Sequence, residues 1–153
     1  MRQDLTWYGS HSAIDESRVL EVEEELGVSF PRDFAQYIVL HHGGSPRQSD
    51  FSYADPRIGH VNSCLAELLS FDPEYADNIV LTVNDLADQL PTGVTPFGAT
   101  GFGDYVCFDF RQDSVSPRVA YWCHEKPTGE SVIPLAATFS EFLDLLRPPA
   151  DEE

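Results

Sequence analysis

The 153-residue sequence predicts an α+β domain in which helices pack against a central, mostly antiparallel sheet. Three observations lead to this class. The apolar pattern changes along the chain from helical spacing to alternation and back to helical spacing. The length suits one compact domain, because two halves would each be too small for a good core. Apolar residues make up 42% of the chain and aromatic residues 12%, which is enough to build that core.

Two helices are expected first. Asp15 is a suitable N-cap for a helix that runs to about Leu26 and stops at Gly27. Pro31 then opens a second helix, at a position where its missing N–H costs nothing. The apolar face of this helix is formed at helical spacing by Phe34, Tyr37, Ile38 and His41, and Gly43 and Gly44 end it.

The middle of the chain predicts strands around one ambiguous segment. Residues 64–71 are expected to form a strand that Asp72 and Pro73 end. Residues 79–90 carry apolar side chains at helical spacing, but β-branched residues at the start of this segment also allow a strand there. Residues 94–97 predict a short strand, followed by a loop with Gly98, Gly101 and Gly103.

The last third predicts three strands and a helix. Residues 105–110 alternate and leave one face fully apolar, residues 119–123 form a partner strand, and residues 131–135 form an edge strand. Thr138 and Glu141 have the spacing of a capping box at the start of the final helix, which Pro148 and Pro149 prevent from continuing. The predicted domain spans residues 13–147, with a loosely held segment at 1–12 and an acidic tail at 148–153.

The charge of the chain limits the classes of partner that it can bind. Nine basic residues against 26 acidic ones give a net charge of −17. Such a chain repels phosphate backbones and anionic lipid, and it favours capture of a basic partner. With no apolar leader or membrane-spanning run, we expect a cytoplasmic protein. Cys64, Cys107 and Cys123 form no CxxC pair, so neither a disulfide framework nor a structural zinc site is expected.

The acidity is concentrated in one stretch. Between Arg57 and Arg111 there is no Lys or Arg at all. An ordinary solvated surface explains any single carboxylate of this stretch. The stretch as a whole repels itself, which makes most physical sense if something positive docks there. The predicted partner-binding residues are therefore Glu67, Asp72, Glu74, Asp77, Asp85, Asp88 and Asp104.

No motif for chemistry accompanies this acidity. The glycines at 98–103 have the spacing G-x-x-G-x-G and precede a strand, which favours a hairpin loop over nucleotide binding. Side chains that could converge from neighbouring strands are Asp104, Asp109, His124 and Glu125, but no hydrolase or protease signature includes them. Cys107, Cys123 and His124 are weak candidates for metal ligands, because they lack the short-range pairing of ligands that is typical of zinc sites. We expect no catalytic residue, no metal ion and no cofactor.

A series of short motifs over residues 14–146 resembles the SUKH superfamily, the SMI/KNR group. The motifs are Glu23-x-x-Leu26-Gly27, Pro31-x-x-Phe34, His42-Gly43-Gly44, Phe71-Asp72, Leu90-Pro91-x-Gly93-Val94-x-Pro96-Phe97-Gly98, Gly103-Asp104-Tyr105-Val106-Cys107-Phe108-Asp109, Val119-x-Tyr121-Trp122-x-His124-Glu125 and Phe139-x-Glu141-Phe142-Leu143. Two positions depart from the family pattern, which usually has Asn at the position of His42 and Asp at that of Cys123. The resemblance implies structural roles for Glu23, Leu26, Gly27, Pro31, Gly43, Gly44, Pro96, Gly103, Asp109, Trp122, His124, Phe139 and Phe142.

The resemblance also implies a fold and a role. It implies helices that flank an antiparallel sheet, and a binding module without chemistry of its own. Bacterial members are similar to immunity proteins that neutralise secreted toxins, often nucleases, whereas fungal members are cell-wall assembly regulators. We therefore expect an immunity protein against a basic toxin, or alternatively a cytosolic regulatory scaffold, as a monomer or weak homodimer. Residues 43–57 are expected to form a surface loop or, as an alternative, a variable binding loop.

Overall fold

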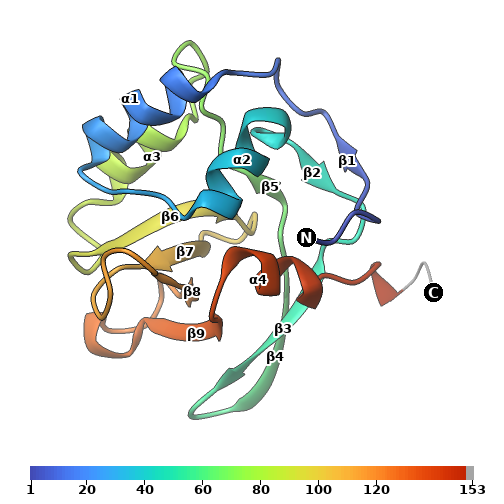
Figure 1. Ribbon diagram of the computed structural model, residues 1–153. Coiled ribbons are helices and arrows are strands. Elements are labelled where there is room, and N and C mark those ends of the chain that lie inside the picture. The colour runs from blue at the N-terminus through green and yellow to red at the C-terminus, as the bar shows by residue number, and fades with distance from the viewer. Residues whose placement is uncertain (151–153) are drawn as a thin grey trace.

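The computed structural model describes residues 1–150 and confirms the α+β class (Figure 1). Its helices are α1 (Glu16–Leu26), α2 (Arg32–His41), α3 (Ile79–Leu86) and α4 (Phe139–Leu145), with a short 3-10 turn at Thr128–Glu130. Its strands are β1 (Trp7–Tyr8), β2 (Ser45–Pro46), β3 (Asp50–Asp55), β4 (Gly59–Cys64), β5 (Glu67–Leu68), β6 (Val94–Ala99), β7 (Tyr105–Asp109), β8 (Arg118–Trp122) and β9 (Val132–Ala136).

The main sheet contains β5 to β9 in sequence order, and every neighbouring pair is antiparallel. In the β7–β8 pair, Val106 lies opposite Tyr121 and Phe108 lies opposite Val119. A register shift between Pro96 and Gly98 interrupts the β6–β7 pair, and a bulge suits a residue without an N–H donor. The last strand, β9, is an edge strand as predicted, and it contains Pro134.

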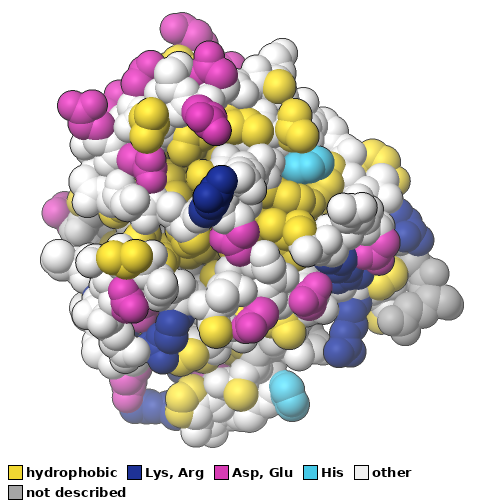
Figure 2. Space-filling model, viewed as in Figure 1, with side chains coloured by type: hydrophobic (Ala, Val, Ile, Leu, Met, Phe, Trp, Pro, Cys, Tyr) yellow, Lys and Arg dark blue, Asp and Glu magenta, His cyan; other side chains and the backbone are white. Residues whose placement is uncertain are grey.

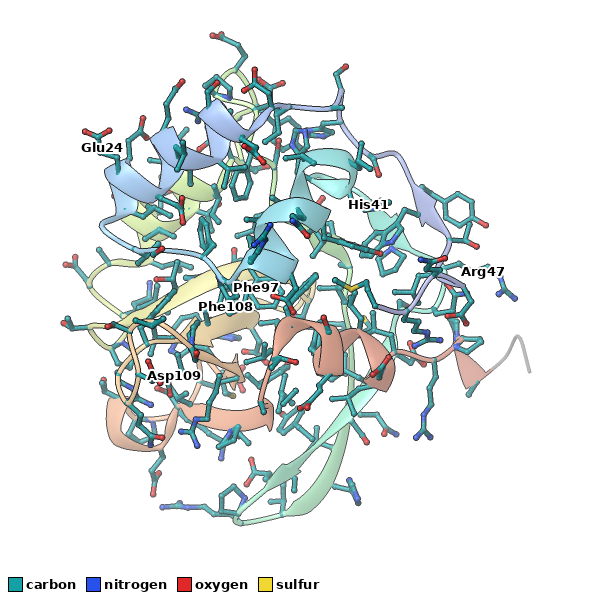
Figure 3. All side chains as sticks on the ribbon, in the orientation of Figure 1. Glu24, His41, Arg47, Phe97, Phe108 and Asp109 are labelled. Atoms are coloured by element: carbon teal, nitrogen blue, oxygen red, sulfur yellow. The ribbon has the colours of Figure 1, made fainter. Side chains whose placement is uncertain are left out.

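The main core lies between the helices and one face of this sheet. Phe34 of α2 is fully buried at its centre, and Figure 3 shows Phe97 and Phe108 beneath that helix. The rings of Phe97 and Phe108 stack with their centroids 4.4 Å apart. The opposite face of the sheet has a smaller apolar cluster built on Val94, Cys107 and Trp122. The alternation predicted for residues 105–110 therefore gives two buried faces of unequal size.

Local signals in the sequence set the helix ends. The Asp15 carboxylate accepts the N–H of Arg18, and Gly27 ends α1 with a φ of 70°. At α4, the Thr138 hydroxyl accepts the N–H of Glu141, as the capping box predicts. The carboxylate of Glu141 accepts the N–H of Ala137 instead of the N–H of Thr138 itself. The helical interpretation of residues 79–90 is confirmed, but α3 ends at Leu86 and turns follow it.

The prediction for residues 43–71 was wrong. Instead of a loop and then a strand over residues 64–71, β3 and β4 form a hairpin that projects from the body (Figure 1). Of the expected strand, only Glu67–Leu68 pairs within the main sheet, as β5. The hairpin forms because Phe51 and Tyr53 alternate toward the core, where Tyr53 stacks on Tyr121 at 4.2 Å between ring centroids.

The N-terminal segment also differs from expectation, because hydrogen bonds hold it against the domain. The Arg2 guanidinium donates to the carbonyl oxygens of Leu143 and Leu146 at 2.7 Å each. The indole N–H of Trp7 donates to the Tyr37 hydroxyl at 2.6 Å. Of the expected tail at 148–153, residues 151–153 lie outside the described part of the chain. Within residues 1–150, no helix combines the length and the apolar character needed to cross a bilayer.

Candidate functional site

Six of the seven predicted partner-binding carboxylates lie in one continuous part of the chain, residues 67–88, which we call the acidic segment. Glu67 lies in the edge strand β5, and Asp85 lies in α3. Asp72, Glu74 and Asp77 lie in the connection between these two elements, and Asp88 follows α3. The side chains of Glu67 and Asp72 are half-buried and the other four are exposed.

The carboxylates of the acidic segment affect one another. Burial first, and then the charge of Asp77, raises the pKa of Glu67. Burial also raises the pKa of Tyr105, and the charges of Asp77, Glu67 and Asp85 raise it further. Within residues 1–150, none of the six carboxylates pairs with a Lys, Arg or His side chain. The six carboxylates of the acidic segment therefore form no ion pair within residues 1–150.

Several cationic side chains form ion pairs with carboxylates outside the acidic segment. The Arg18 side chain is only 14% exposed and pairs with Glu21 of its own helix at 3.2 Å, while its Nε donates to the carbonyl oxygen of Phe71, within the acidic segment, at 2.8 Å. Lys126 pairs at 2.9 Å with Asp55, the last residue of β3. Because α1 packs beside α3, it adds its own outward carboxylates, among them Glu24 (Figure 3). Figure 2 shows Asp and Glu gathered over α1 and the loop above it, while Lys and Arg on this face lie at its centre, on its right and at its lower left.

Asp104, the seventh predicted residue, lies apart from the acidic segment in a hydrogen-bonded cluster. One carboxylate oxygen accepts the Tyr121 hydroxyl at 2.6 Å. The other accepts the backbone N–H of His124 at 3.0 Å and lies 2.6 Å from its Nδ1. Ser63 of β4 contacts the same Tyr121 hydroxyl at 3.1 Å. The Asp104 carboxylate thus joins the β6–β7 loop to the end of β8, and we omit it from the proposed binding surface.

Of the four side chains that could converge for catalysis, the structure brings Asp104, His124 and Glu125 together and leaves Asp109 apart. Asp104 and His124 meet, but the neighbour of His124 Nε2 is the Glu125 carboxylate at 3.8 Å, which is no nucleophilic hydroxyl or thiol. Asp109 lies at the opposite end of β7, where Arg111 donates to it from Nε at 2.9 Å. Burial would raise the pKa of Asp109, but the hydrogen bonds from Arg111 outweigh burial and lower it. Through these contacts, the carboxylates of Asp104 and Asp109 hold strands and turns together.

The cysteine set does not form a metal centre in the described chain. Cys64, Cys107 and Cys123 are all unpaired. Cys107 is fully buried on the second face of the sheet, and burial raises the pKa of its thiol well above the ordinary value. Throughout residues 1–150, no three His, Cys, Asp or Glu side chains are placed to share a metal ion.

His42, one of the departures from the family pattern, has a structural role that sequence reasoning missed. Its ring is fully buried, and its Nδ1 accepts the N–H of Phe71 at 3.0 Å. Its Nε2 donates to the carbonyl oxygen of Ser12 at 2.8 Å. These backbone partners fix a neutral ring, since Nδ1 has to remain unprotonated. Gly43 follows with a φ of 76°, and a Cβ there would come within 2.6 Å of the His11 ring.

Acidification is expected to destabilise the fold through His42. Burial lowers the pKa of His42 in the folded protein below its ordinary value of 6.5. The unfolded chain therefore binds the proton more readily, so the stabilisation is complete above that value and is lost as the pH falls through the folded pKa. Urea unfolding at about pH 7.5 and about pH 5.5 should show a larger loss for the wild type than for His42→Asn. Equal losses would contradict this role.

Sequence reasoning also missed an apolar hollow, which we call the socket. It has a volume of about 720 Å³ and lies between the end of α1, the end of α3 and the loop after β7. Its lining includes Leu26, Val83, Leu90, Val94, Phe110 and Val115. These residues come from separate segments of the chain, so no local pattern reveals the socket.

Other family-motif residues are structural. The Glu23 carboxylate accepts the N–H of Phe30 at 2.6 Å and closes the turn between α1 and α2. Phe139 and Phe142 are fully buried in the main core. At Gly103, a Cβ would come within 2.9 Å of the His124 ring, so this position requires glycine.

Comparison with known proteins agrees with this architecture. No curated protein matches the chain. Residues 13–145 match the sequence model of the SMI1 / KNR4 family (SUKH-1), which covers α1 to α4 and the whole main sheet. The chain belongs to the SMI1 / KNR4 family.

Proposed function

We propose that this protein is a non-catalytic binding module that neutralises a basic toxin, such as a nuclease, by docking its acidic segment onto that toxin. The observation that carries the proposal is the run of six carboxylates from Glu67 to Asp88 without a paired cation in the described chain. Uncompensated like charge destabilises the compact state through self-repulsion. A basic partner relieves that repulsion and is also steered toward it.

The physical role of such a module is occlusion. Enzymes that grip phosphate backbones present Lys and Arg around their active clefts. An acidic protein that associates quickly with such a cleft blocks it without breaking any bond. Asp104 and His124 have no part in this role beyond holding the β6–β7 loop to β8.

Co-expression tests this function directly. The toxin would be the C-terminal domain of a secreted protein encoded beside this gene, expressed in a sensitive host with and without this chain. Rescue of growth together with recovery of a one-to-one complex supports neutralisation. Growth arrest despite full expression of this chain contradicts it. A complex with an endogenous host protein in place of any toxin would instead support the regulatory scaffold.

Charge reversal in the acidic segment is expected to slow association with the toxin. For the variant Asp77→Lys with Asp85→Lys we expect an association rate about tenfold or more below the wild type, because exposed charges act mainly on the encounter rate. The matched control is Asp144→Lys, an exposed carboxylate on α4. Stopped-flow measurements at about 50 mM and about 500 mM salt should show a steep salt dependence that the double variant loses. A rate independent of salt would remove the electrostatic part of the proposal.

A further inference from the structure

The socket differs from the other hollows of the surface in its chemistry. Its lining residues come from the end of α1, the end of α3, the start of β6 and the loop after β7. None of these lining residues is charged. The groove between α1 and α2, by contrast, has a volume of about 420 Å³ and includes Glu16, Glu23 and Arg32 in its lining. The socket is thus the larger of the two and, unlike that groove, is lined without charged residues.

The edge of the socket is held in place. Val115 lies on its lining and is 80% exposed, which is unusual for an apolar side chain. The Asp113 carboxylate accepts the N–H groups of Val115 and Ser116 at 2.9 and 3.0 Å. The loop therefore presents Val115 in a fixed position before any partner arrives, which reduces the entropic cost of binding.

Two carboxylates adjoin the lining residues of the socket in the sequence. Asp88 is exposed and directly follows Ala87, which is part of the lining. Asp113 directly precedes the lining residue Ser114. Arg111, in the same loop, donates to the Asp109 carboxylate from Nε at 2.9 Å, so its charge is compensated. The negative border of the socket thus consists of Asp113 and of Asp88, the last carboxylate of the acidic segment.

This combination selects one kind of occupant. The strongest protein contacts come from a bulky side chain that fills a pocket and is surrounded by polar contacts. The negative border disfavours an acidic segment or another anion, and the net charge of −17 disfavours a second copy of this chain. A basic segment with one bulky apolar side chain satisfies both the lining and the border.

We infer that the socket between α1, α3 and the loop after β7 receives a bulky apolar side chain from a basic segment of the protein partner, with the flanking cations of that segment placed against Asp88 and Asp113. This inference rests on the proposed function and names the docking site for it. The apolar contact slows dissociation of the complex, while the carboxylates speed association.

Three synthetic peptides test the docking site on the isotope-labelled full chain by nuclear magnetic resonance. The first has lysines on both sides of a central leucine, the second replaces the leucine with asparagine, and the third replaces the lysines with glutamates. We expect saturable shifts at Val83, Ala87 and Val115 with the first peptide. The second should bind about tenfold more weakly, since its central side chain loses the apolar contact. The third should produce no shifts.

Two variants separate the socket from the rest of the surface. Ala87→Trp fills the socket from an exposed position, so the fold should survive, and it should abolish the saturable shifts. Gln36→Trp, exposed in the groove between α1 and α2, is the matched control and should leave them unchanged. Equal binding of the leucine and asparagine peptides, shifts centred on the groove between α1 and α2, or normal binding by Ala87→Trp would each overturn the inference.

The toxin experiment keeps this inference separate from the proposed function. If Ala87→Trp still rescues growth as well as the wild type, the socket is not the docking site, although the module still neutralises. If the wild-type chain rescues no toxin, the proposed function fails, whatever the peptides show. Rescue by the wild type and by Gln36→Trp, together with loss of rescue by Ala87→Trp, supports both.

Discussion

Phe34→Ala is expected to lower the free energy of unfolding by about 3–5 kcal/mol, the range for loss of a buried aromatic ring. Phe34 has no exposed surface, and its ring lies 5.0 Å from that of Phe108 and 5.1 Å from that of Phe139 between centroids. It therefore connects α2 both to the sheet and to α4. The substitution removes contacts on several sides at once and leaves a cavity that these neighbours cannot all close.

Urea denaturation followed by circular dichroism measures this change. The matched control is Leu40→Ala in the same helix, where the side chain is 60% exposed and we expect a change within about 0.5 kcal/mol. Because whole domains are stable by only about 5–15 kcal/mol, Phe34→Ala should remove a large part of the total. A loss for Phe34→Ala no greater than that for Leu40→Ala would contradict the central place of this ring.

Asp104→Ala is expected to cost about 2–4 kcal/mol of stability while leaving neutralisation intact. The carboxylate is 13% exposed. It accepts hydrogen bonds from the Tyr121 hydroxyl and from the backbone N–H of His124, and it contacts Nδ1 of the His124 ring. Its removal leaves the partly buried hydroxyl of Tyr121 with the hydroxyls of Ser63 and Tyr53 as partners. Burial and the hydrogen bond to Asp104 both raise the pKa of Tyr121, so the phenol remains a donor at every physiological pH.

Stability and function have to be measured separately for this variant. Denaturation gives the free energy of unfolding, with Asp88→Ala as a control at an exposed carboxylate. Growth rescue at reduced temperature, where the variant remains folded, gives the function. Wild-type stability combined with lost rescue would show that Asp104 acts on a partner or substrate, and it would revive the catalytic alternative.

The elements that the sequence predicted well are those with local causes. The end of α1 at Gly27 and the start of α4 at Thr138 depend on caps within a few residues of the helix. The strands β7 and β8 follow from alternation in a single short segment. The hairpin of β3 and β4 was missed because only β3 carries an alternating apolar pattern. The polar strand β4 exists because β3 pairs with it, which is a non-local cause.

The same distinction applies to the candidate site. The acidic segment is visible as a run without Lys or Arg, because it is continuous in the sequence. The internal role of Asp104 is not visible, since it depends on Tyr121, which the β7–β8 register brings within reach. Val83 and Val115 meet across the socket only after folding. The charge of the acidic segment could therefore be predicted from the sequence, whereas the shape of the socket could not.

Pro134 in β9 has a consequence for behaviour at high concentration. A proline offers no N–H to an incoming strand, so the outer side of the last strand is a poor template for fibre growth. The proposed role as a stoichiometric antidote would require accumulation ahead of the target, and concentrated β-proteins are prone to polymerise along open edges. Pro134 opposes such assembly through β9.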